Sequence, residues 1–327
     1  MRIHLQSLAG SPSNFPLDAE VWTAAAARAP DVSSGHEVSY GTTPEEFAAA
    51  APEVEVLISQ TNALAAVLPF EAPRLKMVFC TSAGLEKLSP FDWLPPGVPI
   101  LNNRGTHAVK AGEYGIMALL MLASRIPALV TAQHEQAWRP LHGSVLAGRH
   151  VVVVGLGALG GSVAAQARHF GMRVTGIRAT ATPHEACHRV LPMEALESVL
   201  PEAEFLFLAP PLTDATRGML SRSRIALLPR HAGVVNIGRG GLVDQDALLD
   251  ALDAGQIAGA VLDVFTPEPV PPGHRLWTTR NLLMTPHTSA DDPLTYNART
   301  LDIFFENLRA LRDGRALPNR FDPARGY

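Results

Sequence analysis

The stretch VVVVGLGALGGSVAAQARHFGMRVTGIR, residues 151–178, decides the fold of this chain. Its four leading valines predict a strand that is buried on both faces. The glycine-rich turn GLGALG follows at residues 155–160, and an alanine-rich segment of helical length comes next. A second strand-like run at residues 173–177 completes a β-α-β unit. The stretch therefore predicts the first part of a nucleotide-binding sheet.

The three glycines of this turn have distinct physical roles in such a unit. Gly155 permits the tight turn after the strand, Gly157 lets the backbone approach a pyrophosphate, and Gly160 lets the helix pack closely on the strand. Free amide groups at the start of the helix then bind the anion. The turn therefore predicts a dinucleotide site formed by Gly155, Gly157, Ala158, Leu159 and Gly160.

The end of the second strand bears on the choice of cofactor. In NAD-binding units an acidic residue at this place binds the ribose hydroxyls. This chain has Arg178 there, with Thr180 two positions later. A guanidinium offers a planar fork to the 2′-phosphate of NADP, and the threonine adds a hydroxyl. We therefore predict that the protein binds NADP(H). The alternative is that Arg178 is a surface residue without a role in binding and that the cofactor is NAD(H).

Strand-like runs alternate with helical segments over most of the remaining chain. Several runs are almost entirely apolar, as is typical of parallel strands covered on both faces. The predicted strands are residues 2–6, 55–59, 76–80, 151–155, 173–177, 204–208, 233–237, 257–264 and 281–284. Strands separated by segments of helical length predict an α/β fold with doubly wound parallel sheets.

Two long helical segments indicate how the chain is divided. Residues 106–124 and 292–312 carry apolar side chains at helical spacing. Asp291 and Asp292 are placed to cap the start of the second segment, and Gly314 lies near its end. The nucleotide-type unit begins only near residue 150, after a separate α/β unit. We therefore predict one domain from residues 1–104 and 287–327, with a second domain, residues 105–286, inserted between them.

The composition argues against several classes of function. The 327 residues carry a formal net charge of -4, which provides no field to attract nucleic acid or anionic lipid. No apolar run reaches the ~20 residues of a membrane helix, and the N-terminal MRIHLQSLAG lacks an apolar signal core. Cys80 and Cys187 are too few for a disulfide framework or a thiolate metal site. We expect a cytoplasmic protein with no metal site and no nucleic-acid or membrane partner.

Charged side chains follow the last three predicted strands. Arg239, Glu268 and His287 each lie just beyond one of them. Ligands bind beyond the carboxyl ends of the strands in an open α/β sheet, so these three groups should meet next to a nicotinamide pocket. Each residue alone fits an ordinary loop, but their coincidence predicts an active site.

These residue types suit the reduction of a 2-keto acid. Arg239 offers a cation that binds a carboxylate and polarises the carbonyl group. His287 can deliver a proton to the carbonyl oxygen as hydride reaches the carbon. Glu268 beside the histidine would stabilise the charged imidazolium form. The three residues together therefore predict general acid and base catalysis coupled to hydride transfer.

At this point the sequence resembles the D-isomer-specific 2-hydroxyacid dehydrogenase family. The matching motifs occur in the family's order over most of the chain. The specific ones are GLGALG (155–160), VNIGRGGLVD (235–244), LDVFTPEP (262–269) and TPHTSA (285–290). The weaker ones are TSAGLEKL (81–88), LNNRG followed by AGEYGIMALLML (101–122), and PPLTDATRGML (210–220).

The resemblance implies both a fold and a set of roles. The fold is a Rossmann cofactor domain inserted into a flavodoxin-like substrate-binding domain made of both chain ends. Arg239 would bind substrate, Glu268 would tune the histidine, and His287 would be the acid and base. Asp263 would hold the nicotinamide carboxamide, and the amides of Ala83 and Gly84 the substrate carboxylate. The further cofactor-binding candidates are Arg178, Thr180 and Ile237, and Arg178 departs from the Asp of many family members.

The implied activity is reduction of a small 2-keto acid to a D-2-hydroxy acid, of the NADP-preferring glyoxylate or hydroxypyruvate reductase type. An arylpyruvate is a further candidate substrate. Two alternatives stay open: a dinucleotide-sensing binding protein similar to corepressors, and a phosphite dehydrogenase of the same fold. Formate dehydrogenases are similar in fold but lack an acid at the position of Glu268. A homodimer paired through residues 106–124 is the expected assembly.

Overall fold

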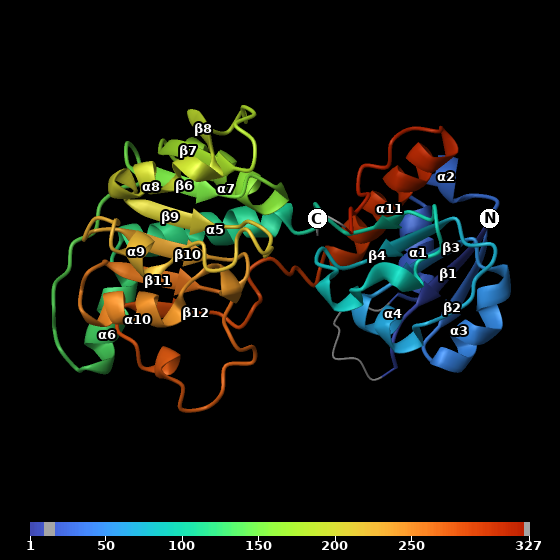
Figure 1. Ribbon diagram of the computed structural model, residues 1–327, viewed down its shortest axis with the longest axis horizontal. Helices are drawn as coiled ribbons and strands as arrows, with labels where there is room; N and C mark the ends of the chain where they lie inside the picture. Colours follow the sequence, from blue (N-terminus) through green and yellow to red (C-terminus); the bar gives the residue numbers. More distant parts are fainter. Residues whose placement is uncertain (10–16, 324–327) are drawn as a thin grey trace. The chain divides into compact units, whose positions relative to one another are not determined.

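The computed structural model describes residues 1–9 and 17–323 (Figure 1). The chain divides into two units, Met1–Thr106 with Asp292–Tyr327, and His107–Asp291. We expected the second unit to span residues 105–286, but it extends to Asp291. The reason is that the backbone amide of His287 donates to the carbonyl oxygens of Asp263 and Thr285, at 2.9 and 3.0 Å. His287 therefore belongs to the second unit and not to the C-terminal part of the first.

The first unit is built on a five-stranded parallel sheet with the order β2-β1-β3-β4-β5. This is the strand order of flavodoxin-like folds. Its strands are β1 (Arg2–Gln6), β2 (Glu37–Gly41), β3 (Val56–Ser59), β4 (Met77–Cys80) and β5 (Ile100–Leu101). Its helices are α1 (Ala19–Ala26), α2 (Pro30–Ser33), α3 (Pro44–Ala50), α4 (Thr61–Val67) and α11 (Tyr296–Arg312).

The second unit is built on a seven-stranded parallel sheet with the order β12-β11-β10-β9-β6-β7-β8. The order reverses between β6 and β9, as it does in Rossmann folds. The strands are β6 (His150–Val154), β7 (Arg173–Arg178), β8 (Arg189–Pro192), β9 (Phe205–Leu208), β10 (Gly233–Asn236), β11 (Gly259–Leu262) and β12 (Leu282–Met284). The helices are α5 (Ala108–Ala123), α6 (Ile126–His134), α7 (Ala158–His169), α8 (Leu196–Val199), α9 (Arg222–Ile225) and α10 (Gln245–Asp253). The predicted class, two doubly wound parallel sheets, is confirmed.

Side chains of the central strands alternate between two apolar layers in each unit. In β6, Val152 and Val154 pack with α8, α9 and α10, whereas Val151 and Val153 pack with α5 and α7. Alternation of this kind follows from the two-residue period of a strand. Because both faces are covered, the sheet's polar backbone is sealed and only the strand ends remain open to ligands.

Helix α11 begins later than its sequence predicts. We expected Asp291 and Asp292 to cap a helix starting at residue 292, but α11 begins at Tyr296, and Thr295 at its start provides no side-chain cap. The carboxylate of Asp292 instead accepts from the amide of Leu294 at 3.1 Å and from the Thr295 hydroxyl. It therefore closes the preceding turn, and the helix starts one turn later.

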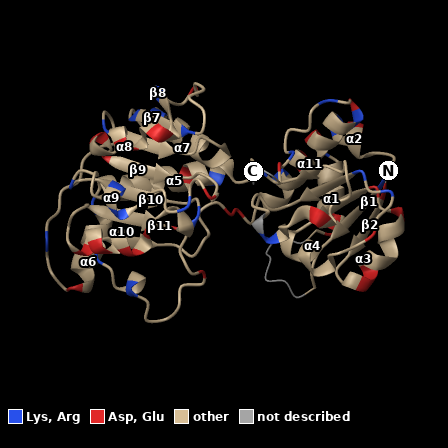
Figure 2. Ribbon diagram, in the orientation of Figure 1, with Lys and Arg blue, Asp and Glu red and all other residues tan. Residues whose placement is uncertain are grey.

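Helix α5 confirms the predicted segment 106–124 to within two residues, ending at Ala123. Among the described residues, no single helix is long and apolar enough to cross a membrane, although α5 and α6, bent by 64° at their junction, together have such length and composition. Positive and negative side chains are interspersed in each unit (Figure 2).

Candidate functional site

The glycine-rich turn joins the carboxyl end of β6 to α7. Gly155 adopts φ +86°, and a Cβ there would lie 2.5 Å from the Pro210 nitrogen. A Cβ on Gly160 would collide with the Gly155 carbonyl oxygen, so the third glycine lets α7 start directly against the turn. At Gly157, by contrast, a Cβ would meet nothing within 4 Å. The turn thus has the shape expected of a phosphate loop, with open space beside its middle glycine.

The start of α7 carries amide groups available to an anion. Gly157 occupies the cap position and no side chain caps the helix. The first amides of a helix have no partner within it, and the helix dipole favours negative charge there. This helix start at the carboxyl edge of the sheet, beside the β6/β9 reversal, could therefore hold a pyrophosphate.

Arg178 is the last residue of β7, at the same edge of the sheet. Its side chain is half-buried and, within the described part of the chain, makes no hydrogen bond or ion pair. Thr180 is exposed, and its hydroxyl lies 3.1 Å from that of Thr182. An unpaired guanidinium at the end of this strand is free to accept a phosphate as its partner.

A pocket lies along the start of α7 that the sequence did not reveal. Its lining includes Gly157, Ser162, Arg168 and His184. The His184 Nε2 atom lies 3.0 Å from where a Cβ on Gly161 would stand, so the imidazole rests against the helix start. No group of three or more potential metal-ligating side chains occurs among residues 1–9 and 17–323.

Three adjacent strands place the predicted catalytic residues. Arg239 follows β10, Glu268 follows β11 and His287 follows β12, and these strands are neighbours in the parallel sheet. Their carboxyl ends therefore lie at one edge. The shared edge explains how residues far apart in the sequence can serve one site.

Glu268 and His287 form a direct pair. The Nδ1 atom of His287 lies 2.8 Å from Glu268 Oε2, while Glu268 Oε1 accepts from the Phe265 amide at 2.7 Å. A carboxylate only accepts, so Nδ1 carries the proton and Nε2 is left for chemistry. The two side chains are 49% and 34% exposed, so the pair is open to an incoming ligand.

The loop that carries Arg239 is fixed from within. The Asn236 side chain donates to the Arg239 carbonyl oxygen and accepts from the Gly238 amide, both at 3.0 Å. The Arg239 guanidinium is half-buried and donates to the Gly238 carbonyl oxygen at 2.8 Å. Its position is therefore set by β10, which reduces the loss of entropy when a ligand binds.

Asp263 has a role that the sequence did not reveal. Its buried carboxylate accepts from the Thr285 hydroxyl at 2.5 Å and from the amides of Thr288 and Ser289 at 2.9 and 3.1 Å. The Tyr114 hydroxyl lies 2.7 Å from that of Thr285. Asp263 thus anchors the loop that holds His287. The expected contact with a nicotinamide carboxamide stays a prediction, as does the cofactor role of Ile237, which is buried at the end of β10.

His287 itself adopts an unusual backbone conformation. Its φ is +54°, in the left-handed region that non-glycine residues seldom occupy. The loop bonds to Asp263 hold it there. Such a conformation usually needs support from its surroundings and is frequent at functional sites.

Ala83 and Gly84 lie in the first unit, in the loop beyond the carboxyl end of β4. The Asn102 side chain donates to the Ala83 carbonyl oxygen at 2.9 Å. Within the described residues, nothing accepts the amide hydrogens of Ala83 and Gly84. Two unpaired amides in a fixed loop are the groups that bind a carboxylate.

Comparison with known proteins identifies the family of this chain. Residues 116–289 match the family described as D-isomer specific 2-hydroxyacid dehydrogenase, NAD binding domain. A glyoxylate reductase from Korarchaeum cryptofilum is 32% identical over 257 residues, covering 76% of each chain. The chain belongs to the D-isomer-specific 2-hydroxyacid dehydrogenase family and is an NAD(P)-dependent oxidoreductase.

Two solved structures are similar over nearly the whole chain. A D-isomer specific 2-hydroxyacid dehydrogenase from Xanthobacter autotrophicus Py2, in complex with NADPH and MES, has a TM-score of 0.81 and 30% identity, covering 99% of both chains. An NADPH-dependent glyoxylate/hydroxypyruvate reductase from Sinorhizobium meliloti, in complex with NADP and sulfate, has a TM-score of 0.80 and 26% identity, covering 100% of both. The fold and the nicotinamide cofactor class are thereby established.

Proposed function

We propose that this protein reduces a small 2-keto acid to a D-2-hydroxy acid with NADPH. The observation that carries the proposal is the His287–Glu268 pair at 2.8 Å, at the same sheet edge as Arg239 and the phosphate loop. A binding protein that only senses dinucleotides needs no such oriented acid and base. Glyoxylate and hydroxypyruvate are the first candidate substrates, since related proteins are named for them.

The roles follow from which atoms the structure leaves available. Bound NADPH supplies the hydride. His287, protonated on Nε2, gives a proton to the carbonyl oxygen as the carbon is reduced, and Glu268 stabilises the imidazolium beforehand. Arg239 polarises the carbonyl group. The free amides of Ala83 and Gly84 are the candidate partners of the substrate carboxylate.

An absorbance assay with a substrate panel tests the proposal. NADPH is mixed with glyoxylate, hydroxypyruvate, pyruvate and phenylpyruvate, and the loss of NADPH absorbance is followed. A parallel reaction supplies phosphite with NADP or NAD. Turnover of at least one keto acid and none of phosphite is expected. Turnover of phosphite alone, or of nothing, would refute the assignment.

The Arg178→Asp substitution is expected to abolish a preference for NADPH. The guanidinium at the end of β7 has no partner among the described residues and would hold the 2′-phosphate, while His184 stands beside the helix start. Loss of a charge-assisted hydrogen bond of about 1.5–3 kcal/mol raises KM for NADPH about 10- to 100-fold. KM for NADH should fall or stay the same.

Steady-state kinetics with both cofactors measure this change. Arg189→Asp alters the same charge at an exposed residue at the start of β8 and should leave both KM values unchanged. An unaltered NADPH/NADH ratio in Arg178→Asp would mean that Arg178 does not select the cofactor.

The Glu268→Gln substitution is expected to lower kcat about 10- to 100-fold, because a neutral amide cannot stabilise the imidazolium as a carboxylate does. The amide oxygen can still accept from the Phe265 amide, so the loop should keep its shape. Glu197→Gln, which removes the carboxylate of an exposed ion pair with Arg224, is the matched control. Equal kcat values in the wild type and Glu268→Gln would remove Glu268 from the mechanism.

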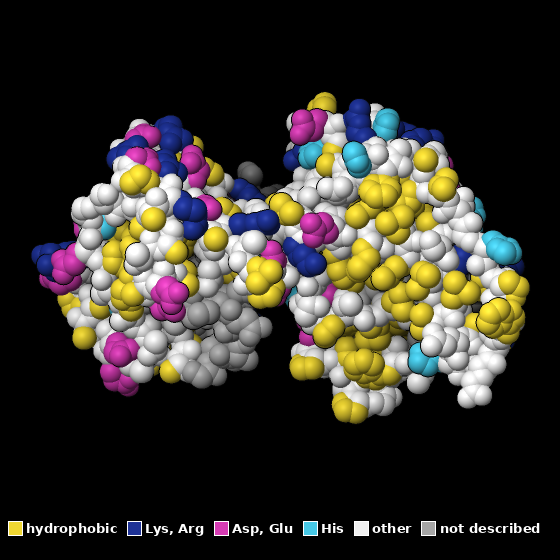
Figure 3. Space-filling model, turned by 180° about the vertical axis from the view of Figure 1, so that it is seen from behind, with side chains coloured by type: hydrophobic (Ala, Val, Ile, Leu, Met, Phe, Trp, Pro, Cys, Tyr) yellow, Lys and Arg dark blue, Asp and Glu magenta, His cyan; other side chains and the backbone are white. Residues whose placement is uncertain are grey.

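We also propose that two copies pair through α5. Its outer face exposes Val109, Met117 and Leu120 by 53%, 37% and 39%. Met117 and Leu120 line a shallow, mainly apolar depression that also includes Glu113. Figure 3 shows hydrophobic side chains gathered on the unit that contains α5. A single apolar helix face suits a two-fold contact, in which the same patch serves both partners.

The Leu120→Arg substitution is therefore expected to turn a dimer into a monomer. A buried, unpaired guanidinium at a two-fold contact is unfavourable on both sides. Light scattering after size-exclusion chromatography gives the mass of the wild type and the variant. Leu227→Arg, at a residue equally exposed at 39%, should keep the wild-type mass. A monomeric wild type would contradict the proposal.

A further inference from the structure

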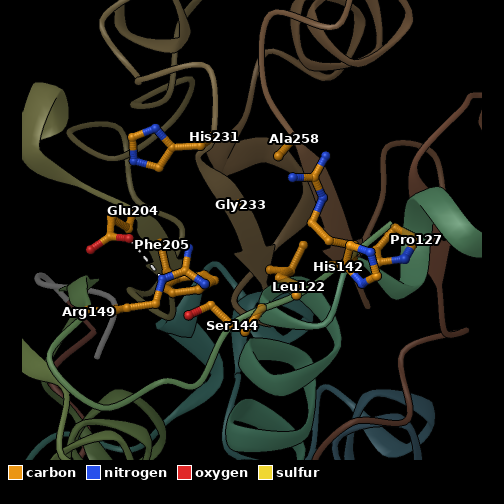
Figure 4. A pocket seen from close by; sticks show the side chains of 13 residues that line it. Leu122, Pro127, His142, Ser144, Arg149, Glu204, Phe205, His231, Gly233 and Ala258 are labelled. Atoms are coloured by element: carbon orange, nitrogen blue, oxygen red, sulfur yellow. Dashed lines mark hydrogen bonds and ion pairs between the residues drawn. The ribbon is translucent and has the colours of Figure 1, made fainter. Parts of the chain in front are cut away.

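A pocket of about 340 Å³ opens at the amino ends of the strands of the second sheet (Figure 4). Arg149 immediately precedes β6, Phe205 begins β9 and Gly233 begins β10, and all three line it. In a parallel sheet these ends lie opposite the edge that carries Arg239 and His287. The pocket is therefore separate from the site described above.

Arg125 is the unexplained group in this pocket. Its Nε atom is buried and has no hydrogen-bond partner among residues 1–9 and 17–323. In the described part of the chain, its guanidinium takes part in no ion pair either. A buried donor without an acceptor costs free energy, and nearly all such groups in proteins are paired or bind water or an ion. Arg125 as a whole is half-buried, and an acceptor bound in the pocket would supply the partner that its buried Nε–H lacks among the described residues.

The backbone at Arg125 strengthens this inference. Arg125 adopts φ +62°, between the end of α5 and the start of α6. Glycine would fit this left-handed position with less strain. Arg125 also occupies the cap position of α6, and no side chain caps that helix. The first-turn amides of α6 and a positively charged side chain thus occur together beside the pocket.

The acidic side chain in the lining is already neutralised. Glu204 Oε2 accepts from Arg149 Nε at 2.8 Å, and Glu204 Oε1 accepts from the His150 amide at 3.1 Å. Burial alone would raise the pKa of Glu204, but these two hydrogen bonds hold it below its ordinary value. The Arg149 guanidinium also lies 4.3 Å from the centre of the Phe205 ring. The charge of Arg125 is therefore left unbalanced.

Other hydrogen-bond donors surround the same space. His142 and His231 stand on opposite sides of the pocket in Figure 4, with Ser144 below. His231 and Arg125 also line a neighbouring depression that includes Arg230. Leu122 and Pro127 form an apolar wall of the pocket. Donors on several sides suit a tetrahedral anion, and the apolar wall suits a small organic body.

We propose that this pocket is a second anion site, which binds the phosphate group of a small metabolite with Arg125 as its main ligand. This site lies at the amino edge of the sheet, whereas the phosphate loop lies at the carboxyl edge. Its main ligand is a side-chain guanidinium, whereas the phosphate loop binds through backbone amides. It does not depend on the proposed reaction, since the ligand would bind whether or not the protein reduces keto acids.

Calorimetric titration with inorganic phosphate, in protein saturated with NADPH, tests the proposal. Binding at the wild-type pocket is expected, and Arg125→Asn should weaken it about 10-fold or more, because a charge-assisted hydrogen bond is lost. Asparagine tolerates the left-handed backbone, so the fold should persist. Arg320→Asn, at an exposed arginine of the first unit, should bind as the wild type does. Phosphate held elsewhere would be unaffected by the Arg125 change.

A second variant distinguishes the loss of a phosphate ligand from a loss of the fold. The His231 side chain is exposed and makes no hydrogen bond within the described residues, so His231→Gln should fold normally and weaken phosphate binding severalfold. Malonate is titrated in parallel as a carboxylate probe. Equal phosphate affinity in the wild type and Arg125→Asn, no binding to the wild type, or tighter binding of malonate would each overturn the proposal.

Discussion

The His287→Asn variant is expected to lose about 1,000-fold in kcat, because a positioned general acid contributes about 10²–10⁴-fold to such a reaction. Asparagine accepts the left-handed backbone that residue 287 needs at φ +54°, and the anchoring bonds to Asp263 involve backbone amides. The loss should therefore reflect the missing proton donor and not a collapsed loop.

Cofactor binding separates these two causes. The dissociation constant of NADPH, followed by nicotinamide fluorescence, should be the same in His287→Asn and the wild type. His169→Asn, at an exposed histidine at the end of α7, should retain full turnover. A His287→Asn protein with normal kcat would show that the proton comes from another group.

The Arg239→Gln variant is expected to lose about 10²–10⁴-fold in kcat/KM for the keto acid, since two hydrogen bonds from a charged donor contribute about 1.5–3 kcal/mol each. The loss should divide between KM and kcat, because the guanidinium holds the ground-state carboxylate and also stabilises charge on the carbonyl oxygen. Asn236 fixes the loop through the Arg239 carbonyl oxygen, which the substitution leaves in place.

The Arg239→Lys variant separates the effect of the positive charge of the guanidinium from the effect of its planar shape. Lysine keeps the positive charge but cannot bind a carboxylate through a planar fork, so it should restore only part of the activity. Full activity in Arg239→Lys would mean that charge alone is used. Unchanged kcat/KM in Arg239→Gln would exclude the residue from the site.

The fold could be predicted wherever strands are buried on both faces. The predicted strand at residues 2–6 coincides with β1, and the run at 151–155 differs from β6 by one residue at each end. The strands that the sequence did not predict, β2, β5 and β8, are all at sheet edges. Most side chains of β2 and β8 are exposed or half-exposed, so their sequences lack the apolar run that marks a central strand. The strand β5 is buried but has only two residues, which is too short for such a run.

The part of the candidate site that follows from sheet topology could be predicted from the sequence. Parallel strands bring their carboxyl ends to one edge, so Arg239, Glu268 and His287 could be grouped from their places after strands. The anchoring of the His287 loop by Asp263 could not, since it depends on backbone amides directed by a loop conformation. The unpaired, buried Nε–H of Arg125 could not be predicted either, because no sequence pattern indicates that a side chain lacks a hydrogen-bond partner.

Isotope transfer tests the central claim most directly. The protein is given hydroxypyruvate and NADPH carrying deuterium at carbon 4 of the nicotinamide, with each of the two stereoisomers in turn, and the product is analysed by mass spectrometry and chiral chromatography. We expect D-glycerate with one deuterium on the carbinol carbon from a single stereoisomer. Unlabelled glycerate from both stereoisomers, the L product, or the absence of any product would contradict hydride transfer at the Arg239, Glu268 and His287 site.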